Sequence, residues 1–330
     1  MALFAVLMCV NFASCSNENE IVPNEPQKPK EYTVSLGFTG DISISESPLS
    51  RTTEKETDLY GFIVLSKPTN EENNAYTNIY AYGLFDDVSN LNIKLLEGYK
   101  YKFVSTMVVN GTNVIFWNPS NEFKSYGLPF RMLLKNAFTY SEAGCPYEYN
   151  LRFSDSSTGS TYNITHSLPI ADRYYGELLD FKPSDESNKA NIYMERTVFG
   201  AKFVSENLNE GKLKIEMTGA ALIELTPDKT QIENIYTISP NSAYGKGEIS
   251  VSHATTITWE KSDGAIVPLG EFNLTFKRNK MTTVTIKVND MSAENGIGIT
   301  LDDEEMTEGD NITIENGKII DTNVNTGTEE

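Results

Sequence analysis

Apolar and polar residues alternate in short stretches along most of this chain. In the first stretch, YTVSLGFTGDISI at 32–44, the residues that share one face are Val34, Leu36, Phe38, Ile42 and Ile44. Successive side chains of a β-strand point to opposite faces, so this period of two predicts a half-buried strand. The run LYGFIVL at 59–65 is apolar at nearly every position. It therefore predicts a strand that is buried more completely.

The same pattern continues through 92–109, where NIKLL is followed by the turn Glu97-Gly98 and a second alternating run. Aromatic residues alternate with lysines in that run, which predicts one packed face and one solvated face. Asn110-Gly111 is a strong hairpin signal, and we expect 112–117 to return as the partner strand. The best helical candidate is RMLLKNAF at 131–138, and it is short.

The second half of the chain repeats this pattern, with turns rich in Gly, Asn and Asp between the strands. Strands are expected at 190–194, 198–204, 213–217, 232–238, 255–259, 272–276, 281–288 and 297–301. Regular short strands separated by turn residues predict an all-β fold, a sandwich or a barrel. Two sandwiches fit a length of 330 residues. We expect the seam between them near 171–186, where PSDESN predicts a loop.

The N-terminus predicts an exported protein. The apolar run at 2–10 is too short to span a bilayer but fits the core of a secretory signal. The residues FASC that end at Cys15 resemble a bacterial lipobox, in which the cysteine carries the lipid. We therefore expect a signal peptide at 1–14, lipidation at Cys15 and an acidic, proline-rich tether at 15–31. The alternative is an apolar N-terminus without a signal. No Lys or Arg precedes Lys28, which leaves open a start upstream of Met1.

Composition excludes several classes of partner. The chain has 46 acidic and 27 basic residues, a formal net charge of −19. Such a surface repels nucleic acid and anionic lipid headgroups, so neither is an expected partner. Of the cysteines Cys9, Cys15 and Cys145, the first lies in the expected signal and the second is the expected lipid site. Cys145 then stands alone, without a disulfide partner, and no histidine lies near it in sequence.

Catalytic signals are absent from the sequence. His166 and His253 are the only histidines, and their spacing is not that of zinc ligands. There is no P-loop and no Gly-x-Ser-x-Gly motif, so we expect neither an enzyme nor a cofactor. The acidic runs at 86–87 and 302–305 are candidate calcium ligands. We interpret them as solvated loops because the EF-hand spacing is missing.

Aromatic side chains leave a glycan-binding role open. Tyrosines in or near expected loops are Tyr76, Tyr80, Tyr82, Tyr174 and Tyr175. A tyrosine ring stacks on a sugar as readily as it covers the edge of a core. The sequence does not decide between these uses.

Several phrases of the chain resemble the fimbrillins, the type V pilus subunits of Bacteroides-type bacteria. They are SESPLSRTT at 45–53, YAYGLFD at 80–86, LLEGYKYKF at 95–103, DRYYG at 172–176, RTVFGAKF at 196–203 and FKRNKMTTVTIKV at 276–288. The resemblance covers most of the chain after Glu31. It implies two transthyretin-like, Greek-key β-sandwich domains, which we place at 32–172 and 173–330.

The resemblance also implies a mode of assembly. Such subunits travel to the cell surface as outer-membrane lipoproteins, and a trypsin-like protease cuts them after an arginine. A strand from a neighbouring subunit then fills the groove that the removed strand leaves. Here the cut would fall between Arg51 and Thr52, and 32–51 would contain the removable strand. Without the resemblance, the polar loop favours an ordinary surface arginine at Arg51 over a cleavage site.

The donor strand and the role of the subunit stay open at this point. The alternating segment Asn311–Ile320 is a candidate donor strand, and it is equally able to close its own sheet. Stalk, tip and anchor roles are all compatible with the sequence. The alternative function is a surface lipoprotein that binds glycans for polysaccharide uptake, and a hydrolase is the least supported.

Overall fold

The computed structural model describes residues 29–42, 57–71, 75–114, 116–118, 125–126, 130, 132–142, 145, 168, 170–238, 243–288, 298–305, 311–315 and 318–321. These residues form an all-β fold, as the alternating pattern predicts. The first half contains β1 (Glu31–Gly40), β2 (Leu59–Pro68), β3 (Asn78–Phe85), β4 (Asn92–Leu96), β5 (Tyr99–Val108), α1 (Gly111–Val114), β6 (Phe116–Asn118), β7 (Ser125–Tyr126), β8 (Met132–Leu133), β9 (Arg173–Phe181) and β10 (Lys189–Arg196).

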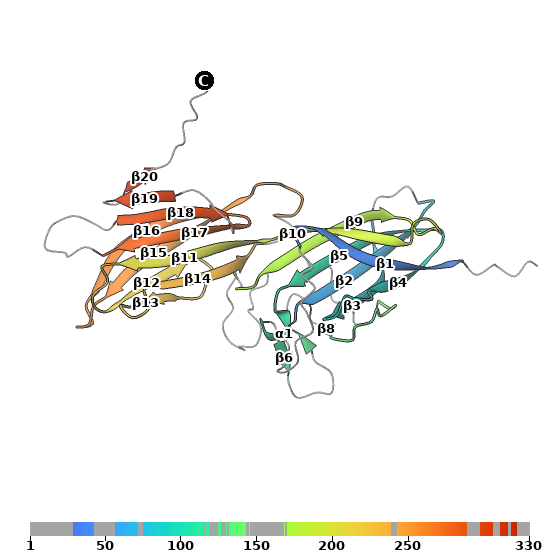
Figure 1. The fold of residues 1–330 in the computed structure, drawn as a ribbon, viewed down its shortest axis with the longest axis horizontal. Helices are drawn as coiled ribbons and strands as arrows, with labels where there is room; N and C mark the ends of the chain where they lie inside the picture. The colour runs from blue at the N-terminus through green and yellow to red at the C-terminus, as the bar shows by residue number, and fades with distance from the viewer. Residues whose placement is uncertain are drawn as a thin grey trace, which may run out of the picture.

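The second half is built mainly from strands among its described residues. They are β11 (Val198–Glu206), β12 (Lys212–Met217), β13 (Ile223–Leu225), β14 (Gln231–Thr237), β15 (Ser250–Glu260), β16 (Ile266–Lys277), β17 (Lys280–Lys287), β18 (Gly298–Glu305), β19 (Asn311–Glu315) and β20 (Lys318–Asp321). Two groups of sheets lie end to end along the long axis of the molecule, and the chain passes between them from β10 to β11 (Figure 1).

The two groups share one order of strand pairing. In the first, β1 lies between antiparallel β4 and parallel β10, while β2 lies between β3 and β5. In the second, β11 lies between antiparallel β14 and parallel β17, while β12 lies between β13 and β15. The first strand of each group is therefore an internal strand. The groups differ at one edge, because β10 pairs with β9 whereas β17 pairs with β18 and the sheet continues into β19 and β20.

Each group has its own apolar core. Phe62, Phe103, Val34 and Ile192 belong to the first core, and Phe203, Ile215 and Phe276 belong to the second. β2 is buried on both faces, as its apolar sequence predicts. Its outer face packs on a third cluster to which Phe130 and Met132 contribute. Burial of each large apolar side chain contributes roughly 1.5–3 kcal/mol before the entropy of ordering is counted.

Three local predictions from the sequence are wrong. Residues 132–133 form a short strand and not a helix. Asn110-Gly111 does not turn a hairpin, because 111–114 form one helical turn and β5 pairs with β2 and β9. The acidic run 302–305 lies within β18 and not in a loop. At 132–133 and 302–305, strand pairing outweighs local propensity.

Sheet membership also bears on the division of the chain. Both β9 and β10 pair within the first sheet, and β11 opens the second group. A division between sheets therefore falls at Thr197, and not between 172 and 173. The predicted loop around PSDESN does exist, but it joins β9 to β10. The division into two domains remains a prediction.

Candidate functional site around the first strand

β1 is hydrogen-bonded on both edges although it comes first in the described chain. It runs antiparallel to β4 from Glu31, opposite Leu96, to Ser35. It runs parallel to β10 from Ser35 to Gly40, opposite Met194. Without β1, the facing edges of β4 and β10 would each expose unpaired backbone groups. The position of β1 is therefore a slot that a strand must fill.

Apolar side chains of β1 seal the first core from inside this slot. Tyr32, Val34 and Leu36 retain 9%, 0% and 8% of their exposure. The Phe38 ring stacks on Tyr60 with 5.5 Å between ring centroids. The polar residues between them face outward, as the period-two pattern predicts. The slot thus presents apolar sites for alternate residues of the strand that occupies it.

The far end of the slot meets the junction between the two groups of sheets. Gly40 has a φ of 98°, and an added Cβ there would collide with the Met194 carbonyl oxygen. Next to it, the Asp41 carboxylate accepts a hydrogen bond from the Arg196 backbone N–H at 3.0 Å. The same carboxylate lies 3.8 Å from the Arg278 guanidinium. The end of β1 therefore contacts a residue of the second group of sheets.

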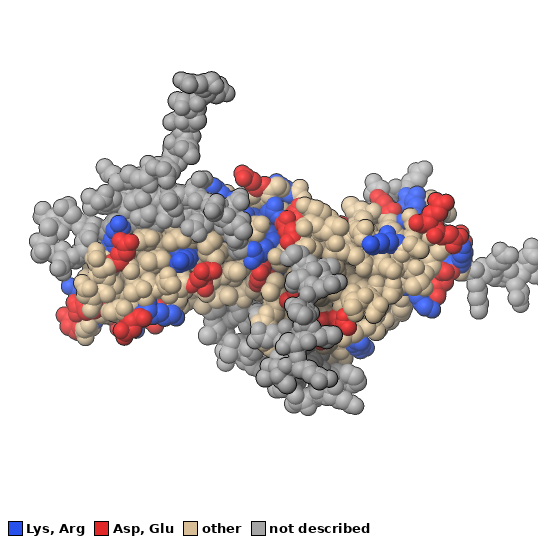
Figure 2. Space-filling model, viewed as in Figure 1, with Lys and Arg blue, Asp and Glu red and all other residues tan. Residues whose placement is uncertain are grey.

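Further ion pairs surround this contact. Arg196 donates two hydrogen bonds to the Asp172 carboxylate, at 2.8 and 2.7 Å. Arg278 lies 3.5 Å from Glu195 and donates to the Gly247 carbonyl at 3.0 Å. Figure 2 shows basic and acidic side chains side by side at the middle of the molecule, where the two groups meet. Because these groups are largely buried, water screens them less than it screens exposed ion pairs.

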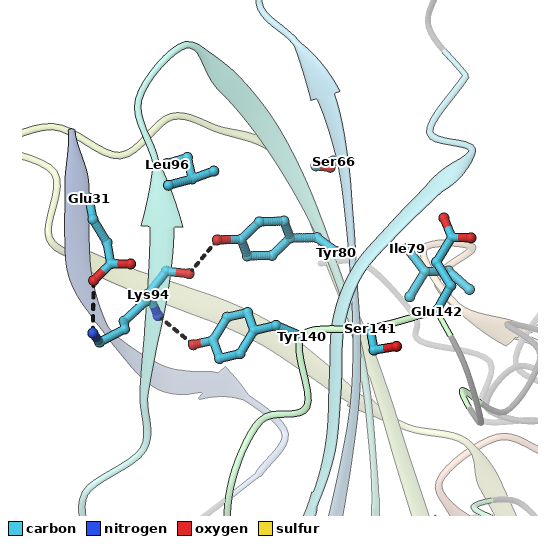
Figure 3. A pocket seen from close by; sticks show the side chains of 9 residues that line it. All are labelled: Glu31, Ser66, Ile79, Tyr80, Lys94, Leu96, Tyr140, Ser141 and Glu142. Atoms are coloured by element: carbon cyan, nitrogen blue, oxygen red, sulfur yellow. Dashed lines mark hydrogen bonds and ion pairs between the residues drawn. The ribbon is translucent and has the colours of Figure 1, made fainter. Parts of the chain in front are cut away.

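Tyrosine hydroxyls occupy the outer edge of β4. The Lys94 N–H donates to the Tyr140 hydroxyl at 2.9 Å, and the Tyr80 hydroxyl donates to the Lys94 carbonyl at 2.8 Å (Figure 3). Two positions along, the Leu96 N–H donates to the Tyr101 hydroxyl at 2.8 Å. An edge strand normally offers such groups to another chain. Here side chains satisfy them, so β4 is held without a strand on that side.

Two of these tyrosines, Tyr80 and Tyr140, line a shallow pocket of about 540 Å³. Glu31 and Lys94 form an ion pair of 2.8 Å at its wall, and Tyr140 is 47% exposed. Burial raises the pKa of Tyr80 to about 12, since its hydroxyl faces the protein and not water. The ring edges pack on one another, with 5.7 Å between the Tyr80 and Tyr140 centroids. Tyr80, Tyr101 and Tyr140 thus cover the outer edge of β4, and we call them the tyrosine cap.

The lipid and cleavage residues predicted from the sequence, Cys15, Arg51 and Thr52, lie outside the described residues. The structure follows the removable segment 32–51 only as far as Ile42. The tyrosines left open as glycan contacts lie mainly on strands, and Tyr175 is buried. The sequence does not identify Gly40, Asp41 and Arg278 as site residues, because only the fold brings the end of β1 close to the start of β17. A Gly-Asp pair after an alternating run is the one local signal for them.

Other reactive groups do not assemble into a site within the described part of the chain. No group of three or more His, Cys, Asp or Glu is placed there to hold a metal ion. Burial raises the pKa of the Cys145 thiol to about 12, which keeps it protonated. Asp86 accepts a hydrogen bond from Asn136, as part of a turn. No described helix is both long and apolar enough to cross a membrane.

Two fimbrial proteins of Porphyromonas gingivalis are among the solved structures to which this chain is similar. The tip fimbrial protein Mfa3, solved with a C-terminal truncation, is 10% identical at a TM-score of 0.32, over 76% of this chain and 94% of that chain. The fimbrial anchor protein Mfa2 is 7% identical at a TM-score of 0.36, over 87% and 99%. No family model and no curated protein matches the chain. The function proposed for it therefore rests on its own strands and contacts.

Proposed function

We propose that this chain is a structural subunit of a cell-surface fimbria, assembled when a strand of a neighbouring subunit replaces β1. The observation that carries the proposal is the place of β1. It is the first described strand, it is internal to its sheet, and it precedes the predicted cut at Arg51. A cut there would free the segment from the rest of the chain.

If β1 is lost, the contacts around the slot favour its refilling by a new strand over collapse of the empty groove. Loss of β1 would expose two strand edges and the apolar sites now filled by Val34 and Leu36. A new strand of the same pattern would restore both the ladder hydrogen bonds and the burial. The tyrosine contacts of Lys94 would hold β4 in place meanwhile, since they do not depend on β1. The role is structural and adhesive, and it requires no catalytic group.

Export and processing complete the proposal. The subunit would reach the outer membrane through a lipid on Cys15, and a trypsin-like protease would then cut between Arg51 and Thr52. The partners are other fimbrial subunits, in a stalk, tip or anchor position. The candidate donor segment 311–320 forms β19 and β20 on the outer edge of its own sheet (Figure 1). Among the described strands, the segment pairs with β18 alone, which supports its release as a donor.

Truncation tests this proposal. A chain that begins at Thr52 should form oligomers, whereas a control chain that begins at Pro29 keeps β1 and should stay monomeric. Adding a peptide of residues 29–42 should suppress the oligomers by filling the slot. Size-exclusion chromatography with light scattering measures both effects. A chain from Thr52 that stays a folded monomer at high concentration contradicts strand exchange, and so does aggregation that the peptide does not reduce.

Glycan binding is the second candidate, and the tyrosine-lined pocket is the observation in its favour. Glycan binding would require exposed aromatic rings on which a sugar can stack. In the pocket of Figure 3 only Tyr140 is close to half exposed among the aromatic rings, and its hydroxyl accepts a hydrogen bond from Lys94. Glycan arrays with the intact chain and a Tyr140→Ala variant distinguish this function. Strong binding lost in the variant would favour it.

A further inference from the structure

We propose that the slot of β1 selects its incoming strand at the domain junction, by requiring a Gly-Asp pair where Gly40 and Asp41 now lie. This inference rests on the strand exchange proposed above and names the chemistry of the partner strand. The strand would carry apolar residues at the places of Tyr32, Val34 and Leu36. It would then end in glycine followed by an acid.

Steric contact imposes the glycine. An added Cβ at Gly40 would lie 2.4 Å from the Met194 carbonyl oxygen and 3.0 Å from the Tyr193 ring. The positive φ of 98° also disfavours any residue with a side chain. Gly37 offers a comparison within the same strand. Its added Cβ would meet the side-chain oxygen of Asn191 at 2.7 Å, and Asn191 is exposed and free to rotate.

One hydrogen-bond donor and one positive charge impose the acid. The Arg196 N–H points past the end of the ladder, and the Asp41 carboxylate takes the place of the next backbone acceptor at 3.0 Å. Arg278 lies in the turn between β16 and β17, and its guanidinium is 3.8 Å from the same oxygen. Its guanidinium is largely buried, with 15% of the side chain exposed. An incoming strand without an acid would leave the Arg196 N–H without this acceptor and would lose the nearby negative charge.

The candidate donor of this chain does not meet the requirement. If Ile312 and Ile314 took the places of Val34 and Leu36, Lys318 would fall at the place of Gly40. If Asp321 took the place of Asp41, Ile320 would fall there instead. Neither register supplies glycine before an acid. The Gly309-Asp310 pair of this chain precedes the apolar residues of the segment instead of following them. A second copy of this chain would therefore fill the slot more weakly than a strand with the Gly-Asp pair at its end, and the preferred partner is such a strand of a different subunit.

A nicked form of the full chain tests the selection. A recognition sequence for a site-specific protease replaces residues 46–52, and cleavage after folding leaves the β1 fragment bound without a covalent link. Synthetic peptides of residues 29–42 then compete with a fluorescent fragment. The substituted peptides carry Asp41→Asn or Gly40→Ala. Their matched controls carry Glu31→Gln, which removes a charge from an exposed ion pair, and Gly37→Ala.

We expect the Asp41→Asn peptide to compete roughly tenfold more weakly than the unchanged peptide, as for loss of a charged hydrogen bond. The Glu31→Gln peptide should stay within about twofold, because exposed ion pairs contribute little. The loss for Gly40→Ala should exceed that for Gly37→Ala. When the nicked chain carries Arg278→Gln, the difference in competition between the unchanged peptide and the Asp41→Asn peptide should become smaller. When it carries Arg278→Lys, this difference should remain. A peptide of residues 307–322 should compete weakly.

The outcomes separate this inference from the proposed function. If no peptide replaces the fragment, strand exchange itself is overturned. If all peptides replace it equally well, exchange stands and the selection is overturned. The selection is also overturned if the 307–322 peptide competes as well as the unchanged one. A preference for Asp41 that Arg278→Gln leaves intact would rule out the junction as its source.

Discussion

His253 is a half-buried ionisable side chain that packs against aromatic residues of the second core. Its ring lies 5.5 Å from the Phe199 ring and 6.2 Å from the Phe276 ring, measured between centroids. Burial lowers its pKa below the usual value of 6.5, against a smaller opposite effect of the Thr218 backbone. The neutral imidazole therefore packs as an aromatic residue. The histidine thus serves packing against Phe199 and Phe276.

The lowered pKa of His253 predicts acid sensitivity. The unfolded chain takes up a proton near pH 6.5, whereas the folded chain resists it. Stability is therefore full above that pH and falls as the pH drops, by at most about 1.4 kcal/mol per pH unit. His253→Gln should reduce the loss between pH 7 and 5, while His166→Gln serves as the control. Urea unfolding at each pH measures the free energy. Equal pH dependence in the parent and the His253→Gln variant would contradict this account.

At the scale of elements, alternation identifies strands and not their partners. β1 and β10 follow from period two, because one face of each is buried and the other solvated. β9 reads RYYGELLDF, with no clean alternation, and forms because β5 and β10 offer edges on both of its sides. The strand that fills the slot is predictable from the sequence, as an alternating run that precedes a candidate cleavage site. Its junction contacts are not, because Asp41 and Arg278 are far apart in sequence.

The tyrosine cap on β4 predicts local protection of one backbone amide. Tyr140→Phe removes the acceptor of the Lys94 N–H, so hydrogen exchange at Lys94 should accelerate by roughly two- to tenfold, equivalent to about 0.5–1.5 kcal/mol. Amides of β2 should be unaffected. Tyr193→Phe, at a tyrosine that is 50% exposed, is the control. Exchange is followed by NMR. Unchanged exchange at Lys94 would mean that other contacts protect this edge.

At the scale of the whole molecule, assembly and charge oppose one another. The formal net charge of −19 keeps separate copies apart. The slot draws a strand in through apolar burial and backbone hydrogen bonds, which are short-ranged and insensitive to salt. Two copies would therefore approach against a repulsion that burial and backbone hydrogen bonds outweigh only at contact. Repulsion between like-charged copies would keep them apart until a strand is available, which suits the assembly proposed above.

This balance predicts that salt accelerates assembly. The Debye length falls from about 30 Å at 0.01 M to about 10 Å at 0.1 M ionic strength, so chains that begin at Thr52 should oligomerise severalfold faster at the higher value. Light scattering gives the initial rate. Sucrose is the control, since it strengthens burial without screening charge, and it should have a smaller effect than NaCl. A rate that falls with added NaCl would show that attraction between opposite charges governs the encounter, in place of the repulsion expected from the net charge.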